Sequence, residues 1–94
     1  MQIQISDEAV TDLRSAMAFY SEQSADLAAA FFADFDSACE LISERPEIGS
    51  PIEPGNRKVV LQRFPFLLIY KLDEDVIRVL AVGHQRRRPG YWNK

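Results

Sequence analysis

The sequence has 94 residues, of which 47% are hydrophobic and 27% charged, as in an ordinary globular protein of one domain. No apolar run approaches the ~20 residues of a membrane span, and residues 1–5 do not resemble a signal peptide. The single cysteine, Cys39, excludes an internal disulfide, and no Cys/His set has metal-ligand spacing. We therefore expect one domain over residues 1–94, in the cytoplasm, with no metal or cofactor.

The net charge of −3 conceals a strong asymmetry along the chain. From Asp7 to Glu47 there are ten acidic and two basic residues, a balance of −8, and Glu53 adds one more acid. From Arg57 to Lys94 there are nine basic and three acidic residues, a balance of +6. This division predicts one acidic and one basic surface. The pI near 5.0 argues against a protein held on nucleic acid by charge alone.

The first half of the chain predicts a short strand followed by a helical hairpin. Residues 2–5 alternate polar and apolar, which is typical of a strand. Ser6 is suited to cap a first helix that ends near residue 21 or 22, and Ser24 is suited to cap a second helix. Pro46 ends the second helix, whose apolar stripe is Leu27, Phe31, Phe35, Ala38 and Ile42.

The second half predicts three strands after a surface loop over residues 47–56. The strands are expected at 57–63, 67–72 and 76–83. Pro65 separates the first strand from the second, because proline cannot donate to a strand ladder, and an acidic turn at 73–75 joins the second strand to the third. On the last strand, alternation places Ile77, Val79 and Ala81 on one face and Arg78, Leu80, Val82 and His84 on the other. The predicted fold class is α+β: a small, largely antiparallel sheet with a helical hairpin packed on one face.

The end of the chain concentrates the residues best suited to bind a partner. The only histidine, the only tryptophan and three consecutive arginines lie between His84 and Trp92, directly after an apolar run. Imidazole, guanidinium groups and aromatic faces together suit an anionic, planar partner such as nucleic acid. The alternatives are a solvated tail, or a packing clamp in which Trp92 folds against the sheet.

Antiparallel pairing would bring further residues to the same half of the molecule: Arg57, Arg63, Tyr70, His84 and the run Arg86–Arg87–Arg88. His84 can transfer a proton, an arginine can hold a phosphate, and Tyr91 or Trp92 can stack on a base. Such a set can cleave RNA without a metal. A histidine at a strand end can equally be structural, and no clear acid and base pair is present.

Two segments resemble the RelE/ParE toxin superfamily. Arg63-Phe64-Pro65-Phe66-Leu67-Leu68-Ile69-Tyr70 is similar to its "RFPY-x-I-x-Y" segment. The stretch 79–92, Val-Leu-Ala-Val-Gly-His-Gln-Arg-Arg-Arg-Pro-Gly-Tyr-Trp, is similar to its closing "LAV-x-H-x-RR-x-P-x-YW" segment. The element order also agrees, so the resemblance spans nearly the whole chain.

The resemblance implies the toxin of a bacterial type II toxin–antitoxin module, neutralised by a cognate antitoxin protein. ParE-like members poison DNA gyrase, whereas RelE-like members cut mRNA on the ribosome. The low pI, the presence of only three lysines, and Phe66 in place of a commoner tyrosine depart from the nuclease pattern. We therefore favour the ParE-like branch, with a RelE-like endoribonuclease and a decayed, non-toxic module member as alternatives.

The resemblance also implies roles for particular residues. Arg63, Arg87 and Arg88 match the family's motifs and are expected to bind the target, together with Arg57 and Trp92, which the residue chemistry alone singles out. His84 and Tyr91 are candidate catalytic residues only if the protein is an endoribonuclease.

Overall fold

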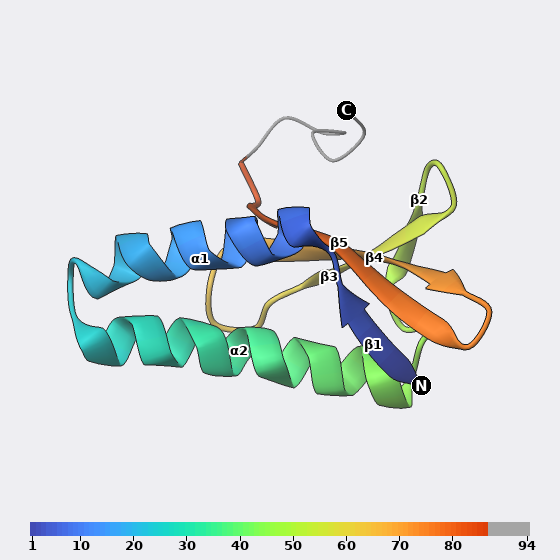
Figure 1. Cartoon of the computed structure of the whole chain (residues 1–94), viewed down its shortest axis with the longest axis horizontal. Helices are drawn as coiled ribbons and strands as arrows, with labels where there is room; N and C mark the ends of the chain where they lie inside the picture. Colours follow the sequence, from blue (N-terminus) through green and yellow to red (C-terminus); the bar gives the residue numbers. More distant parts are fainter. Residues whose placement is uncertain (87–94) are drawn as a thin grey trace.

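The computed structural model describes residues 1–86 and confirms the α+β architecture. Its elements are β1 Gln2–Ile5, α1 Asp7–Ser21, α2 Ala25–Glu44, β2 Ser50–Ile52, β3 Asn56–Val60, β4 Phe66–Asp73 and β5 Val76–His84. The five strands form one sheet in the order β1-β5-β4-β3-β2, antiparallel except where β1 runs parallel to β5. The helices form an antiparallel hairpin that packs against this sheet (Figure 1). No helix within residues 1–86 is long and apolar enough to cross a membrane.

Both helices begin at the predicted serine caps. The Ser6 hydroxyl accepts a hydrogen bond from the amide of Ala9, and the Ser24 hydroxyl accepts one from Leu27, each at 3.0 Å. These bonds satisfy amides that the first helical turn leaves without partners. The second helix ends at Glu44, because Pro46 disfavours helical backbone at the residue before it.

The core lies between the helical hairpin and the sheet. Its fully buried centre includes Phe31 of α2 and Tyr70 of β4. The ring of Phe31 packs against Tyr20, Phe64 and Phe66 with centroid distances of 5.5, 5.3 and 4.8 Å. The apolar helical stripe predicted from the sequence is therefore core. Cys39 packs at the edge of this core as a partly buried apolar side chain.

The strand bounds differ from the prediction in two places around β3. The segment predicted as a surface loop contains a short edge strand, β2, which pairs with Asn56–Lys58. β3 ends at Val60 rather than at Arg63. It ends early because the amides of the next segment turn toward the carboxylate of Asp34 instead of toward a neighbouring strand.

The predicted face assignment on the last strand was wrong because β5 contains a bulge. Ile69 pairs with Ala81 whereas Tyr70 pairs with Val79, so Leu80 has no opposite residue. An extra residue reverses the alternation beyond it. Val82 and His84 therefore lie on the helix-covered face with Ile77 and Val79, not on the opposite face.

Side chains near the start of α1 hold this bulge. The hydroxyl of Ser6 donates to the carbonyl of Leu80 at 3.2 Å, and its amide donates to the carbonyl of Val79 at 3.0 Å. The carboxylate of Asp12 accepts the amide of Val82 at 3.0 Å. The sequence offers no bulge signal on β5 itself, because the stabilising groups come from a helix about 70 residues earlier.

Candidate target-binding surface

Loop 61–65, which joins β3 to β4, presents Arg63 to solvent. The buried carboxylate of Asp34 on α2 accepts the backbone amides of Gln62, Arg63 and Phe64 at 3.2, 2.8 and 3.0 Å. A carboxylate can accept several hydrogen bonds at once, and bonds to a charged acceptor are stronger than neutral ones. The loop backbone is therefore fixed while the Arg63 side chain remains exposed.

The end of β5 lies directly beside this loop. The amide of Gln85 donates to the carbonyl of Pro65 at 2.9 Å, and the ring of His84 lies 5.4 Å from that of Phe66. The Nδ1 atom of His84 accepts the amide of Arg86 at 3.1 Å. We call the group Arg63, His84 and Arg86 the arginine end of the molecule. The sequence prediction that Arg63 and His84 share one region is consistent with this placement.

Arg57 lies at the opposite end of β3 and points inward. Its Nη1 atom donates to the backbone carbonyls of Glu47 and Gly49, at 3.0 and 2.8 Å. The side chain is half-buried against loop 45–49. Arg57 is thus separated from the arginine end, and its guanidinium group is hydrogen-bonded to backbone carbonyls.

Tyr70, which the sequence analysis grouped with the arginines, is fully buried behind the same loop. Its hydroxyl donates to the carbonyl of Pro46 at 2.7 Å and accepts the amide of Gly49 at 3.0 Å. A Cβ atom at Gly49 would lie only 2.7 Å from this hydroxyl oxygen, so a larger residue cannot fit without displacement. Tyr70 and Arg57 together anchor loop 45–49. Neither side chain is therefore available to a target.

The sheet face away from the helices carries cations that the sequence analysis counted but did not place. Side-chain alternation puts Lys58, Lys71 and Arg78 on this open face, because their neighbours Val59, Tyr70 and Val79 belong to the core. Register pairs Lys71 directly with Arg78. A closer count of alternation along the strands of the second half could have found this set.

Arg78 is already engaged within the open face. Its Nε atom forms an ion pair with Asp73 at 2.9 Å, and Nη1 donates to Gln4 of β1 at 2.7 Å. The hydrogen bond from Arg78 lowers the pKa of the Asp73 carboxyl, helped by the charges of Arg78 and Lys71. This is the one side-chain ion pair within residues 1–86. Lys58 and Lys71 form no such pair there, so they are the cations on this face that can meet an anionic partner.

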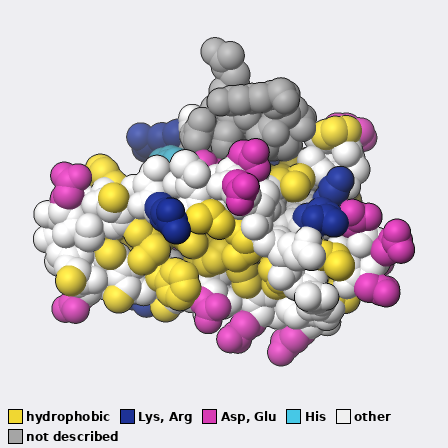
Figure 2. All heavy atoms as spheres, viewed as in Figure 1, with side chains coloured by type: hydrophobic (Ala, Val, Ile, Leu, Met, Phe, Trp, Pro, Cys, Tyr) yellow, Lys and Arg dark blue, Asp and Glu magenta, His cyan; other side chains and the backbone are white. Residues whose placement is uncertain are grey.

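The opposite side of the molecule is acidic and apolar. In Figure 2, hydrophobic side chains gather between the helices and the sheet, Asp and Glu line the lower edge along α2, and Lys and Arg occupy isolated positions. The charge asymmetry of the sequence is therefore also spatial, because the two helices carry eight acidic residues and one cation, Arg14, whereas the strands carry four cations and one acid, Asp73.

The described residues offer few groups for acid–base or metal chemistry. Because Nδ1 of His84 accepts the amide of Arg86, Nε2 is the ring nitrogen that can donate a hydrogen bond to a partner. Burial, with a smaller contribution from Asp36, raises the pKa of the Cys39 thiol to about 11, so this cysteine stays protonated at neutral pH. Within residues 1–86 no three His, Cys, Asp or Glu side chains cluster as a metal site. The predicted residues Arg87, Arg88, Tyr91 and Trp92 lie outside the described part of the chain.

A sequence model of the ParE toxin of the type II toxin–antitoxin system parDE matches residues 3–89. The chain belongs to the ParE toxin family. It is thus a member of a type II toxin–antitoxin toxin family, and the resemblance to the RelE/ParE superfamily is confirmed.

Two solved structures show how widely the fold of this ParE family member is shared. A chain from the chromosomal ParDE toxin–antitoxin system of P. aeruginosa superposes with a TM-score of 0.78 at 22% identity, covering 89% of this chain and 95% of that one. The isolated E. coli RelE toxin superposes with a TM-score of 0.66 at 18% identity, covering 98% and 92%. No curated protein sequence matches the chain.

Proposed function

We propose that this ParE family member inhibits DNA gyrase and is neutralised by an antitoxin. The observation that carries the proposal is the ParE family match over residues 3–89. The arginine end supports it, because it presents an exposed Arg63 on a backbone fixed by Asp34, as a rigid recognition surface requires. The low pI also favours a protein target over a long phosphate backbone.

The antitoxin is expected to complement both halves of the toxin. An amphipathic segment that places acidic residues against the basic half would screen the cations of the arginine end from the target. Because exposed charge pairs weaken with salt, the complex is expected to loosen as ionic strength rises. Affinity that is independent of salt would contradict this electrostatic part of the proposal.

The RelE-like alternative has one observation in its favour. His84 lies at the arginine end beside an exposed arginine, on a fold that the E. coli RelE toxin shares. Against it, no carboxylate within residues 1–86 hydrogen-bonds His84 to set it up for proton transfer. In an endoribonuclease, His84→Ala would abolish cleavage of translated mRNA.

The test is induction of the protein without its neighbouring gene, followed by separate readouts of DNA topology and of mRNA integrity. The proposal predicts that plasmids lose negative supercoiling while translated mRNA remains intact. Cleaved mRNA with unchanged topology would favour the RelE-like function. Normal growth after induction of a folded protein would instead indicate a decayed toxin.

A further inference from the structure

Phe19, near the end of α1, is the most exposed large hydrophobic side chain within residues 1–86, at 60%. Its ring contacts that of Tyr20, with the two centroids 5.2 Å apart. A phenylalanine ring left in water forgoes the free energy that its burial would supply. Single exposed hydrophobic residues are common on protein surfaces, so the surroundings of Phe19 decide whether it belongs to a binding surface.

The backbone places Phe19 beside the end of β5. α1 and β5 run in the same direction, because the serine that caps the helix bonds to Leu80, and Asp12 farther along the helix bonds to Val82. Phe19 follows Asp12 by seven residues, or two helical turns, so it lies on the same face of α1 about 10 Å farther along. Three residues of extended chain beyond Val82 also span about 10 Å and end at Gln85.

A continuous set of aromatic contacts joins Phe19 to the arginine end. The Tyr20 ring lies 4.9 Å from that of Phe64, in the loop that carries the exposed arginine, and 6.2 Å from that of Phe66. The ring of Phe66 lies 5.4 Å from that of His84. Tyr20, Phe64 and Phe66 are partly buried against the core. Phe19 therefore extends the arginine end with an apolar side chain that rests on a packed base.

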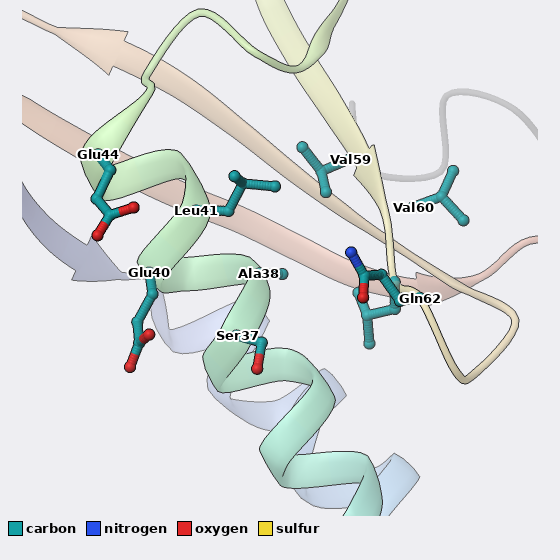
Figure 3. Close-up of a pocket in the computed structure, with 9 residues that line it drawn as sticks. Ser37, Ala38, Glu40, Leu41, Glu44, Val59, Val60 and Gln62 are labelled. Atoms are coloured by element: carbon teal, nitrogen blue, oxygen red, sulfur yellow. The ribbon is translucent and has the colours of Figure 1, made fainter.

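The other side of loop 61–65 has a different character. There a groove between α2 and β3 is lined by Val60 and Gln62 on the strand side and by Glu40 and Glu44 on the helix side (Figure 3). No lysine or arginine of residues 1–86 lines this groove. A partner whose acidic groups meet the arginine end is repelled by these two glutamates. The groove therefore does not continue the surface to which Phe19 belongs.

We infer that Phe19 is an anchor residue of the target-binding surface, which inserts into an apolar pocket of gyrase while acidic groups beside that pocket meet Arg63 and Arg86. The inference rests on the proposed function, because it adds an apolar contact to the same target. Both arginines are exposed. Aromatic side chains and arginines together dominate the binding energy of many protein interfaces. A protein fits better than a nucleic acid, which would be held mainly through its phosphates by a chain with a net charge of −3.

The ring of Phe19 and the guanidinium of Arg63 would respond differently to salt. Attraction between exposed charges is screened as ionic strength rises, whereas burial of an apolar ring is not. Loss of Phe19 should therefore weaken binding by the same factor at low and at moderate salt. Loss of Arg63 should matter less at the higher salt concentration. This difference distinguishes a direct apolar contact from an indirect effect of Phe19 on the arginine.

The test measures the affinity of purified toxin variants for gyrase at two salt concentrations. Phe19→Ala should weaken binding about tenfold at both, and Phe19→Leu, which keeps an apolar side chain, should weaken it less. The matched control is Phe32→Ala, which removes a ring that is 45% exposed on α2 and packs against Phe35 of the same helix. The control should leave the affinity unchanged. Urea denaturation should give Phe19→Ala nearly the stability of the wild type, because the ring is exposed.

Three results would overturn the inference. The first is an unchanged affinity of Phe19→Ala and Phe19→Leu, and the second is an equal loss in Phe19→Ala and Phe32→Ala. The third is a loss in Phe19→Ala that shrinks with salt as the loss in Arg63→Ala does, because Phe19 would then act only through the arginine. Phe19→Leu keeps the test valid if the alanine variant proves unstable.

The same measurements separate this inference from the proposed function. If the wild-type toxin does not bind gyrase, the proposed function fails and the inference fails with it. If the wild type binds and Phe19→Ala binds equally well, only the inference fails. Phe19→Ala that binds gyrase normally but binds the protein encoded beside this gene weakly would assign the ring to the antitoxin instead. A wild-type dimer that dissociates in Phe19→Ala, with gyrase binding unchanged, would assign it to a second copy of the chain.

Discussion

The two loops that flank β3 are anchored in different ways. Loop 45–49 is anchored by two side chains, because the Tyr70 hydroxyl and the Arg57 guanidinium form hydrogen bonds with its backbone groups. Loop 61–65 is anchored by one buried carboxylate, that of Asp34, which accepts three backbone amides of the loop. The side chain of Arg63 in this loop is exposed to solvent. Of two arginines six positions apart, one is therefore part of the scaffold and the other belongs to a surface that can recognise a partner.

The largest effect is expected from Asp34→Ala, which leaves three loop amides without their acceptor. We expect a loss of about 3 kcal/mol in the free energy of unfolding, because hydrogen bonds to a buried charge are the strong ones. Urea denaturation measures this loss. Asp36→Ala, which removes an exposed carboxylate two positions away, is the control and should change stability little. A loss equal to that of the control would show that Asp34 does not hold the loop.

Tyr70→Phe tests the other loop. The change removes one hydroxyl and leaves the amide of Gly49 and the carbonyl of Pro46 unsatisfied beneath loop 45–49. We expect it to lower the free energy of unfolding by about 2 kcal/mol. Tyr20→Phe is the matched control, because the hydroxyl of Tyr20 has no hydrogen-bond partner within residues 1–86. Similar losses for the two variants would contradict the anchoring role of Tyr70.

The comparison of the two arginines is tested directly by Arg57→Ala and Arg63→Ala. Removing Arg57 should lower the free energy of unfolding by about 1 kcal/mol, because two carbonyl bonds are lost from a half-buried site. Removing Arg63 should leave stability within about 0.5 kcal/mol of the wild type, as for other exposed substitutions. Thermal unfolding of both variants measures these changes in stability. A larger loss of stability for Arg63→Ala than for Arg57→Ala would contradict the roles assigned to the two arginines.

The smallest effect concerns the open face. The bond from Arg78 lowers the pKa of Asp73, so Arg78→Ala should raise that pKa toward its ordinary value. A lowered pKa stabilises the fold above the ordinary carboxyl value, and the contribution is lost as pH falls through the lowered pKa. The stability difference between wild type and variant should therefore narrow in acid and be constant near neutrality. An NMR titration that finds the same Asp73 pKa in both proteins would contradict the ion pair.

Much of the fold could be predicted because its signals are local. The serine caps, the helical stripe and Pro46 set the helices, and the apolar runs set β4 and β5. The errors came from contacts distant in sequence: Asp34 ends β3 early, and Ser6 and Asp12 stabilise the bulge that turns Val82 and His84 to the other face. No periodicity within a strand reports an acceptor that comes from a helix.

The candidate site shows the same limit. Local patterns identified Arg63 and His84, which the structure places at one end of the molecule. They could not separate Arg57 from these residues, because its partners are backbone carbonyls of loop 45–49. The open-face cations Lys58 and Lys71 needed the strand register before they could be placed.

The central claim is that the arginine end inhibits gyrase as a rigid recognition surface. The most direct measurement is gyrase supercoiling with purified wild-type protein, Arg63→Ala and the exposed control Arg14→Ala. The account predicts that wild type and Arg14→Ala inhibit equally and that Arg63→Ala, fully folded, needs about tenfold more protein. Uninhibited supercoiling at high wild-type concentration, or full inhibition by Arg63→Ala, would contradict it.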